Sequence, residues 1–588
     1  MSVSFRVESL AFNSGERVDV PETGVVVIVG PNNAGKSALL RELTQWCTSD
    51  PVFNPPKVLR EATFVKEGGR EDLEAWLHDH ARELRRPDGP YFRPPAGGEQ
   101  QLVQLTNEWD AGPHVFNLEG VERTRFLIPN VQQFLLFLAS AESRLSLIGS
   151  VAPHNPVADV PTHPLQVLFI QKDLEDELSE TCFRAFGEEL SLSRVVGGEL
   201  ALYLGKPTVE PSVVPDPRYL EELERMPKLQ EQGDGMRSFM GLLLALSTSA
   251  YQVVLIDEPE AFLHPPQARL LGRRLAEESE GKQVFVATHD LHVLQGALEA
   301  DQDVTVVRVQ RSGTTNRPAV LNSAGIRELW KDPLLRYSNT LEGLFHRGVV
   351  VCEADTDARF YGAVLEHWAK ANEEPSKDLL FTHTGGKDRL KLVVRALQAL
   401  QVPVAVVADF DLFRDASVTR ELLEALGGDW SQVETSWRVV NAAITKLGQE
   451  PPRLEVQRKI NEILDGADAV VGRDEVREIR EAIRLIDGWR SAKLGGLAAV
   501  PQGQPSEAAL ELVNQLKSHG LFVVPVGELE RWAPQVAGHG TRWVIEALSR
   551  DVHRDTASQV ASFVLEIAAW IDGLAGPAPT GLEGVGAS

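Results

Sequence analysis

The first group of residues that could do chemistry is the glycine-rich segment G-P-N-N-A-G-K-S at positions 30–37. Its spacing, G-x-x-x-x-G-K-S, is that of a phosphate-binding loop. In such a loop the backbone N–H groups and the N-terminus of the following helix hold phosphate. Lys36 is expected to reach the β and γ phosphates, and the Ser37 hydroxyl to ligate Mg²⁺. The residues expected to hold ATP here are Gly30, Asn33, Gly35, Lys36 and Ser37.

A second group follows an apolar run at 253–256 that is typical of a buried strand. Asp257 is expected to hold Mg²⁺ directly or through water, and Glu258 to polarise the attacking water as general base. A strand that simply ends in an acidic turn would look the same, but the phosphate-binding loop disfavours that reading. His289 follows another apolar run and is expected to contact the γ-phosphate, although a lone histidine is more often structural.

A third group of carboxylates lies in the second half of the chain. Glu353 follows the apolar run 348–352, and Asp409 and Asp411 follow the run 402–408. Phosphodiester cleavage uses Mg²⁺ or Mn²⁺ to neutralise phosphate charge and activate water, and these ions prefer oxygen ligands. The expected metal ligands are therefore Glu353, Asp357, Asp409 and Asp411. Each of them taken alone could instead cap a helix or lie in a solvated loop.

All three groups need strands and helices that alternate along the chain. The run 24–29 predicts a buried strand before the loop, and the apolar residues at 38–40 begin a helix after it. Strand ends in an open parallel sheet bring such side chains to one edge. The sequence therefore predicts an α/β fold. A later strand, 521–526, leads to Glu528 and Glu530, which either add to the metal site or cap the next helix.

Composition limits the class of protein. The chain has 588 residues, too many for one core, and 43% of them are hydrophobic. No apolar run approaches a membrane span and no signal peptide pattern is present, so we expect a cytoplasmic protein that does not bind membranes. Three scattered cysteines indicate a reducing compartment. The net charge of −25 argues against a general nucleic-acid binder, so any nucleic-acid path should be a local basic strip.

One such strip could be the basic, aromatic segment near Arg82–Arg93, which we expect to be a solvated loop rather than a contact with a nucleic-acid backbone.

Another motif precedes the first carboxylate strand, where Gly233-Asp234-Gly235 begins a segment that runs through Ser238. Alone it is a turn. By its position it resembles the ABC signature loop, which caps the ATP of a partner subunit, although it departs from Leu-Ser-Gly-Gly-Gln. Gly233, Gly235 and Ser238 are the candidate ATP contacts.

Residues 1–335 thus resemble the ABC ATPase heads of the RecF and SMC group, particularly those of OLD-family (overcoming lysogenization defect) nucleases. Residues 345–535 resemble the TOPRIM domain of the same family, although Ala354 stands where the family usually has glycine. The resemblance implies a homodimer through the ATPase heads, DNA cleavage or nicking, and a role in anti-phage defence, in which a helicase-like or other defence partner could take part. It also makes Lys493 the candidate transition-state stabiliser; a lysine there is otherwise a surface residue.

The expected organisation is an ATPase domain (1–335) with a helical insertion at roughly 130–215, a TOPRIM domain (345–535), and a helical segment with a disordered tail (536–588). A topoisomerase is disfavoured because Tyr361, the tyrosine near the TOPRIM motifs, fits helix packing better. A transporter ATPase has no use for a TOPRIM site. Two alternatives stay open: an ATP-switched protein that binds nucleic acid or a partner without cutting, and a nuclease that acts on RNA.

Overall fold

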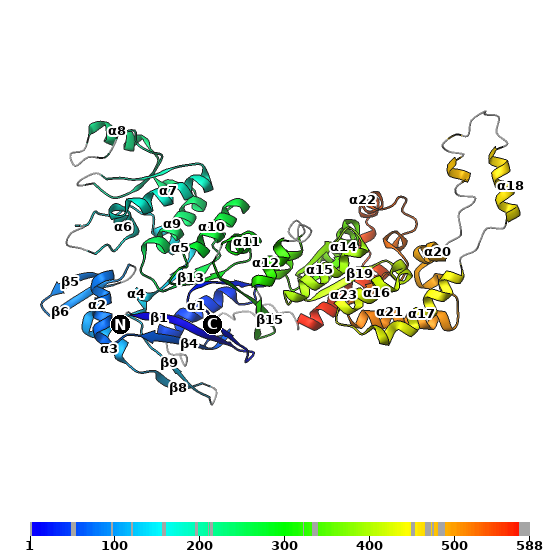
Figure 1. The fold of residues 1–588 in the computed structure, drawn as a ribbon, viewed down its shortest axis with the longest axis horizontal. Coiled ribbons are helices and arrows are strands. Elements are labelled where there is room, and N and C mark those ends of the chain that lie inside the picture. The colour runs from blue at the N-terminus through cyan, green and yellow to red at the C-terminus, as the bar shows by residue number, and fades with distance from the viewer. Residues whose placement is uncertain are drawn as a thin grey trace. The chain divides into compact units, whose positions relative to one another are not determined.

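The computed structural model describes residues 3–48, 55–95, 98–118, 121–155, 160–194, 198–209, 211, 216–300, 302–321, 323–331, 339–447, 453–464, 472, 476–479 and 488–575. The chain forms two compact units that divide between Lys331 and Asp332, and the second unit runs to Ala575. Figure 1 shows the first unit in blue to green and the second in green to red. The predicted disordered tail, from residue 576 on, lies outside the described residues.

The first unit is built on a six-stranded sheet in the order β10-β13-β14-β3-β15-β16. Its first five strands are parallel, and the edge strand β16 runs antiparallel to β15. The strands span β10 (Leu136–Ala139), β13 (Val253–Asp257), β14 (Gln283–Ala287), β3 (Gly24–Val29), β15 (Val304–Ser312) and β16 (Thr315–Leu321). Their runs of buried valine, isoleucine and leucine suit a sheet covered on both faces. The predicted α/β fold is confirmed.

A second sheet packs beside this one and shares its core. It has the order β2-β1-β4, with β1 at Ser4–Phe12, β2 at Arg17–Asp19 and β4 at Leu59–Glu67. Helix α1 (Lys36–Thr48) contributes Leu40, Leu43 and Trp46 to one cluster with residues of β1, β3, β4 and β13. Each large apolar side chain buried in this way contributes about 1.5–3 kcal/mol. The start of α1, which follows the phosphate-binding loop, is therefore held between two sheets.

The first unit has further helices and short strands outside these two sheets. They are α2 (Arg70–His80), α3 (Leu102–Asp110), β8 (His114–Leu118), β9 (Val121–Arg125), α4 (Gln132–Leu135), α5 (Ala141–Ser146), α6 (Pro164–Ile170), α7 (Lys172–Phe186), β11 (Leu190–Leu192), β12 (Leu202–Leu204), α8 (Pro217–Arg225), α9 (Asp234–Thr248), α10 (Pro265–Glu277), α11 (Leu291–Glu299) and α12 (Ser323–Lys331). The segment assigned to an insertion thus contains a strand of the central sheet, β10, besides its helices.

The segment expected to be a solvated loop is instead part of a small sheet, so that expectation is wrong. Strands β5 (Arg82–Arg86) and β6 (Gly89–Arg93) form a hairpin, with β7 (Gln100–Gln101) beside it. Phe92 is fully buried, and Arg86 and Arg93 both form ion pairs with Glu99. The buried aromatic side chain and these ion pairs hold the hairpin in place.

The second unit has a four-stranded parallel sheet in the order β18-β17-β19-β20. Its strands are β18 (Leu379–His383), β17 (Gly348–Cys352), β19 (Val404–Ala408) and β20 (Leu521–Val523). The helices are α14 (Asp355–Ala371), α15 (Leu390–Ala399), α16 (Ala416–Ala425), α17 (Trp430–Lys446), α18 (Arg453–Leu464), α20 (Gly488–Gly495), α21 (Gln504–Ser518), α22 (Thr541–Ser549) and α23 (Gln559–Ala575).

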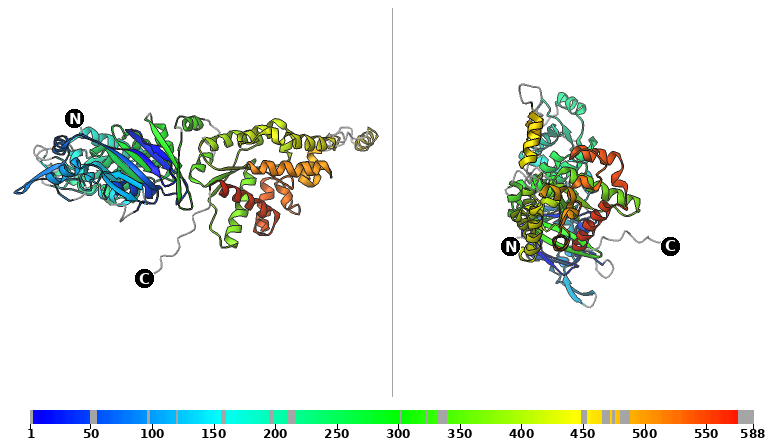
Figure 2. Two further views of the ribbon diagram at one scale, coloured as in Figure 1. Left: turned by 90° about the horizontal axis from the view of Figure 1, so that it is seen from below. Right: turned by 90° about the vertical axis from the view of Figure 1, so that its right-hand side faces the viewer.

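Helices pack around this sheet, and its strands all end at one edge. Helices α17 and α21 lie side by side, as both views show (Figure 1 and Figure 2). The C-terminal helix α23 packs against α14 and belongs to the core, where Ile567 and Ile571 are fully buried. Because all four strands are parallel, the loops after β17, β19 and β20 leave from one edge of the sheet. Tyr361 is buried in the same core, as expected for helix packing.

Candidate nucleotide site and candidate metal centre

The phosphate-binding loop depends on close contacts at two glycines that leave no room for a side chain. Gly30 has φ +145°, and a Cβ there would lie 2.2 Å from the Val309 carbonyl oxygen. Gly35 has φ +97°, and its Cβ would lie 2.9 Å from Asn316 Nδ2. Asn33 also has positive φ (61°), a conformation that asparagine tolerates better than most residues. The loop is thus bent tightly between β3 and α1, with its shape set by β15 and β16.

Lys36 and Ser37 stand at the start of α1, where the loop ends. Lys36 Nζ donates to the carbonyl oxygens of Gly30 (2.7 Å) and Pro31 (3.0 Å). Ser37 Oγ donates to Asp257 Oδ1 at 2.8 Å. Burial raises the pKa of Asp257, and the charge of Glu258 adds to this while the Ser37 hydrogen bond opposes it. An oxygen pair beside a phosphate loop fits Mg²⁺ with ATP, which Ser37 and Asp257 would hold.

Glu258 and His289 are neighbours, but a third carboxylate connects them more closely. Glu258 has φ +47° and a side chain that is 56% exposed, and His289 Nδ1 lies 3.7 Å from its Oε1. Glu260 is buried, lies 3.0 Å from His289 Nδ1 and accepts a hydrogen bond from the His289 backbone N–H. Burial raises the pKa of Glu260. Glu260 therefore orients His289, while Glu258 is left exposed beside it.

Arg144 on α5 also belongs to this group, although no sequence motif predicts it. Its side chain is 1% exposed, and Nη1 donates to the backbone carbonyl of Glu258 at 3.1 Å. Burial lowers its pKa, while the negative charges of Glu260, Asp257 and Glu258 oppose that shift. A buried guanidinium behind the general-base candidate fixes the backbone of Glu258, which itself adopts an uncommon conformation.

The segment that resembles a signature loop begins helix α9. Gly233 and Asp234 are exposed at its N-terminus, and a Cβ on Gly235 would lie 2.5 Å from the Phe262 carbonyl oxygen. Ser238 is buried, and its hydroxyl makes no hydrogen bond among the described residues. In this conformation Gly233 is exposed, Gly235 packs against the Phe262 backbone, and Ser238 faces the interior of its own subunit. Its contact with a partner's ATP stays a prediction.

In the second unit three carboxylates meet at the carboxyl edge of the sheet. Glu353 follows β17, and Asp409 and Asp411 follow β19. One carboxylate oxygen from each lies within 4.8 Å of the others. Glu353 Oε1 also accepts a hydrogen bond from the Asp409 backbone N–H at 3.0 Å, which ties the two strand ends together. We call these three residues the acidic cluster.

Asp357 lies nearby but is not part of the acidic cluster. It stands in the first turn of α14, and its Oδ2 accepts from the Ala354 backbone N–H at 3.0 Å. It therefore caps the helix, which was the alternative to metal binding. Burial, with the charge of Asp409, raises the pKa of Asp357 to about 7. Its service as a metal ligand stays a prediction.

Electrostatics in the acidic cluster favour a cation. Burial raises the pKa of Glu353 to about 8, and the charge of Asp409 adds to the shift. Burial likewise raises the pKa of Asp409, against the nearby charge of Lys493. Grouped carboxylates with raised pKa values lack enough positive charge around them. Hard oxygen donors so placed fit Mg²⁺ or Mn²⁺, which Glu353, Asp409 and Asp411 would hold.

Two lysines partly neutralise the acidic cluster. Lys493 Nζ, from α20, lies 3.1 Å from Asp409 Oδ2 and 3.6 Å from Asp411 Oδ2. Burial lowers the pKa of Lys493, but the charges of Asp409 and Asp411 outweigh this and raise it. Lys387, which follows Gly385-Gly386 after β18, forms an ion pair with Asp411. Lys387 was not predicted from the sequence. The pattern that could have indicated it is a glycine pair before a lysine at the end of a strand.

Lys493 is held in place by two glycines that touch. A Cβ on Gly496 would lie 2.0 Å from the Pro525 carbonyl oxygen, and one on Gly527 would lie 2.1 Å from the Lys493 carbonyl oxygen. Leu497 N–H donates to Pro525 O (2.9 Å), and Phe410 N–H donates to Gly527 O (2.8 Å). We call the approach of Gly496 to Gly527 the glycine contact. It connects the end of α20 to the loop after β20, and the Phe410–Gly527 hydrogen bond connects that loop to the strand end that carries Asp409.

Glu528 and Glu530 follow the same loop and form a second acidic group with His539. Glu528 Oε2 lies 4.0 Å from Lys493 Nζ, so it borders the acidic cluster. Glu530 Oε1 accepts from the Gly540 N–H at 2.7 Å and lies 2.6 Å from His539 Nδ1. Glu528 thus faces the candidate metal centre, whereas Glu530 braces the loop before α22.

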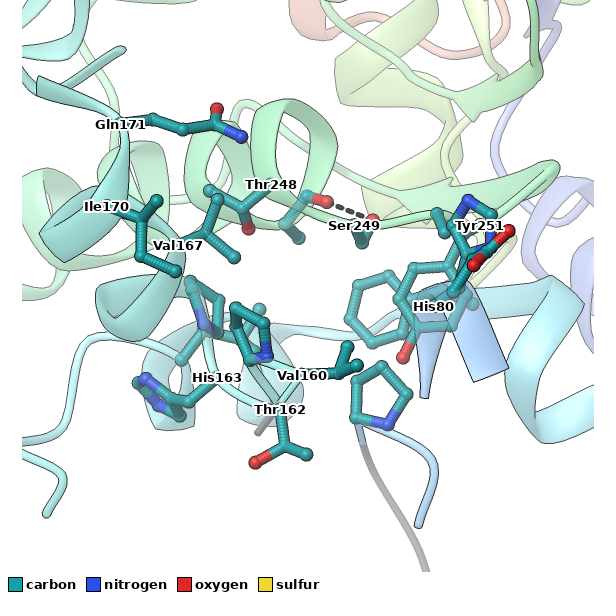
Figure 3. A pocket seen from close by; sticks show the side chains of 18 residues that line it. His80, Val160, Thr162, His163, Val167, Ile170, Gln171, Thr248, Ser249 and Tyr251 are labelled. Carbon is teal, nitrogen blue, oxygen red and sulfur yellow. Dashed lines mark hydrogen bonds between the residues drawn. The ribbon is translucent and has the colours of Figure 1, made fainter. Parts of the chain in front are cut away.

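The first unit also contains a cavity of about 270 Å³. It lies beside Tyr251, before β13, whereas Asp257 stands at the other end of that strand. Figure 3 shows Thr248, Ser249 and Tyr251 on one side of it and Val160, Thr162 and His163 on another. Burial lowers the pKa of His163 to about 4, and its Nδ1 accepts from the Leu165 N–H. His163 is therefore a neutral structural histidine.

The comparisons with known proteins agree with the two units. Residues 224–295 match a family described as "AAA domain, putative AbiEii toxin, Type IV TA system". Residues 344–411 match a family described as "Overcoming lysogenization defect protein-like, TOPRIM domain". The chain therefore joins a domain of the ATPase type to a TOPRIM domain. The two matches, in this order along one chain, support an OLD-family ATPase–TOPRIM protein, as the sequence motifs indicated. No curated protein matches the chain.

Among solved structures, the SMC head domain from Thermotoga maritima has 13% identity and a TM-score of 0.29, and the match covers 55% of this chain and 100% of that one. The SMC head domain of Pyrococcus furiosus, bound to the C-terminal domain of ScpA, has 10% identity and a TM-score of 0.30, with 56% and 99% covered. Within the described residues, no helix is both long and apolar enough to cross a membrane.

Proposed function

We propose that this chain is an ATP-hydrolysing, metal-dependent nuclease that cleaves or nicks DNA. The observation that carries the proposal is the acidic cluster with Lys493 beside it, at the carboxyl edge of a parallel sheet. A divalent ion bound there would neutralise phosphate charge and activate water. Lys493 would stabilise the negative charge that develops on the phosphate.

The ATPase part of the proposal assigns a role to each residue of the first site. Lys36 contacts the β and γ phosphates, and Glu258 polarises the attacking water. His289 reports the γ-phosphate, and Glu260 holds His289 in place. Arg144 is a positioning residue because it contacts the backbone of Glu258.

Assembly and biological role extend this proposal. The exposed N-terminus of α9, with Gly233 and Gly235, is the surface that would cap the ATP of a second copy. We therefore propose a homodimer through the ATPase heads. A role in anti-phage defence, with or without a helicase-like partner, rests on the family resemblance alone.

The test is cleavage of supercoiled plasmid with Mg²⁺ or Mn²⁺, with and without ATP. Asp409→Ala and Glu353→Ala should each lose nicking by on the order of 10²-fold or more, because each removes a main contributor to charge stabilisation. ATP hydrolysis should persist, since its residues belong to the other unit. Glu374→Ala, an exposed glutamate after α14, is the matched control and should cut normally. Undiminished cutting by Asp409→Ala would remove the acidic cluster as the nuclease site.

A second candidate is an ATP-switched protein that binds nucleic acid without cutting it. One observation favours it: Lys387 and Lys493 form ion pairs with the same carboxylates that a metal would need. This candidate predicts nucleic-acid retention without cleavage under every metal condition. Adding an RNA substrate to the same experiment tests the remaining alternative, a nuclease that acts on RNA.

A further inference from the structure

A cleft of about 610 Å³ opens beside the candidate metal centre in the second unit. It is lined by Leu494 and Leu497 after α20, Pro525 after β20, Arg531 and Trp532, and Phe563 on α23. We call it the TOPRIM cleft. A volume of this order is ordinary for a small-molecule or nucleoside site.

The wall of the TOPRIM cleft offers aromatic and apolar surface. The rings of Trp532 and Phe563 lie 5.4 Å apart at an angle of 44°. Trp532 Nε1 donates to the Tyr361 hydroxyl at 3.2 Å, which fixes the orientation of the indole. Leu494 is 41% exposed at the rim. A rigid aromatic surface of this kind is what a nucleobase stacks on, whatever its sequence.

Contacts between neighbouring residues link the cleft to the acidic cluster. Leu494 directly follows Lys493 in the chain, and Arg531 lies between cleft and cluster, with its Nε 3.6 Å from Glu528 Oε1. Glu528 in turn lies 4.0 Å from Lys493, which lies 3.1 Å from Asp409. The backbone segments that place the candidate catalytic groups therefore also build the cleft.

Arg531 also supplies a cation at the mouth of the cleft. Its side chain is 35% exposed, and its buried Nε lies 3.6 Å from Glu528 Oε1. A guanidinium so placed suits a phosphate oxygen, since arginine recognises phosphate through directed N–H groups. A nucleotide carries an apolar base at one end and a phosphate at the other. Apolar walls with a cation at the end nearest the metal centre therefore suit one nucleotide.

We propose that the TOPRIM cleft binds one unpaired nucleobase next to the scissile phosphate, with Arg531 on the adjoining sugar–phosphate backbone. This inference rests on the proposed nuclease function and adds the substrate class, which is single-stranded or locally unpaired DNA. A base in a duplex cannot enter the cleft unless it leaves the stack. An apolar side chain of a protein partner would also fit the walls, but it would offer no acceptor to Arg531.

The test uses a substitution that fills the cleft with a large side chain from an exposed position. Ser562 is exposed on α23 and lines the cleft, so Ser562→Trp places a ring there without removing a core contact. Ala569→Trp is the matched control, because Ala569 is exposed on the same helix two turns further on and does not line the cleft. Both variants are compared with wild type on single-stranded oligonucleotides that carry an abasic position at successive places.

In wild type, one abasic position beside the cut should lower kcat/KM by about 10-fold, within the range expected for one lost stacking contact. Ser562→Trp should lose a similar factor on the complete oligonucleotide and lose nothing more on the abasic one. The binding readout is a fluorescent adenine analogue at the same position, measured with Ca²⁺. Its emission should be quenched by wild type and Ala569→Trp, and not by Ser562→Trp.

Equal cleavage of complete and abasic oligonucleotides by wild type would overturn the inference. If Ser562→Trp reduced cleavage without removing the abasic effect, the occupant would be something other than a base, such as a partner's apolar side chain. Failure of the nuclease proposal is separate: Asp409→Ala would then cut as wild type does, whatever the abasic scan showed.

Discussion

The glycine contact predicts that an added methyl group outside the acidic cluster should disable the metal centre. A Cβ does not approach a carbonyl oxygen closer than 3.0 Å, whereas Gly496→Ala and Gly527→Ala would start at 2.0 Å and 2.1 Å. Each substitution must therefore open the contact by about 1 Å. Lys493 lies on one side of it and the Asp409 strand end on the other, so their 3.1 Å ion pair should stretch beyond hydrogen-bond distance.

A misplacement of about 1 Å in a catalytic group can cost on the order of 10²-fold in rate. Plasmid nicking by Gly527→Ala should fall by that order, while ATP hydrolysis stays at the wild-type rate. Gly503→Ala is the control, because Gly503 also has positive φ (92°) but meets nothing within 4 Å. Thermal unfolding of all three variants separates misplacement from loss of fold. Full nicking by a folded Gly527→Ala variant would refute the positioning role of the contact.

Three further predictions follow from the first unit. Lys36→Ala should weaken ATP binding, whereas Glu258→Gln should bind ATP without hydrolysing it; a wild-type rate for Glu258→Gln would exclude the general-base role. ATP with Glu258→Gln should favour a closed dimer of heads, and identical scattering profiles with and without ATP would count against it. Because burial lowers the pKa of His163 to about 4, its contribution to stability is complete above pH 6.5 and lost as pH falls towards 4. Urea unfolding of the first unit at pH 5 should therefore show a loss of about 2 kcal/mol that His163→Gln removes.

Much of both sites could be predicted because their signals are local. The phosphate loop is a contiguous motif between a valine-rich strand and a helix. Glu353, Asp409 and Asp411 each follow a fully buried strand, and parallel strands bring such ends together. The α/β fold follows from the same alternation of strands and helices.

The rest depends on contacts between distant segments. Arg144 reaches the ATP site from a short helix whose neighbours carry no motif, and only packing shows that it is buried there. Lys387 is separated from its partner Asp411 by a helix and a strand. Ser238 is the fifth residue of a helix whose inward face could not be recognised from the sequence pattern. Strand β10 was hidden in the segment assigned to an insertion because its four residues are too few for a clear period.

The place of β3 in its sheet determines when a newly made chain can first bind nucleotide. Gly24–Val29 pairs on one side with β14 and on the other with β15, and Gly30 rests against Val309. The phosphate-binding loop leaves the ribosome early, yet its neighbours are about 250 to 280 residues behind it. At a synthesis rate of roughly 5–20 residues per second, strands β14 and β15 are made on the order of tens of seconds after the loop. During synthesis, nucleotide binding should therefore appear late and report that the whole first unit has folded.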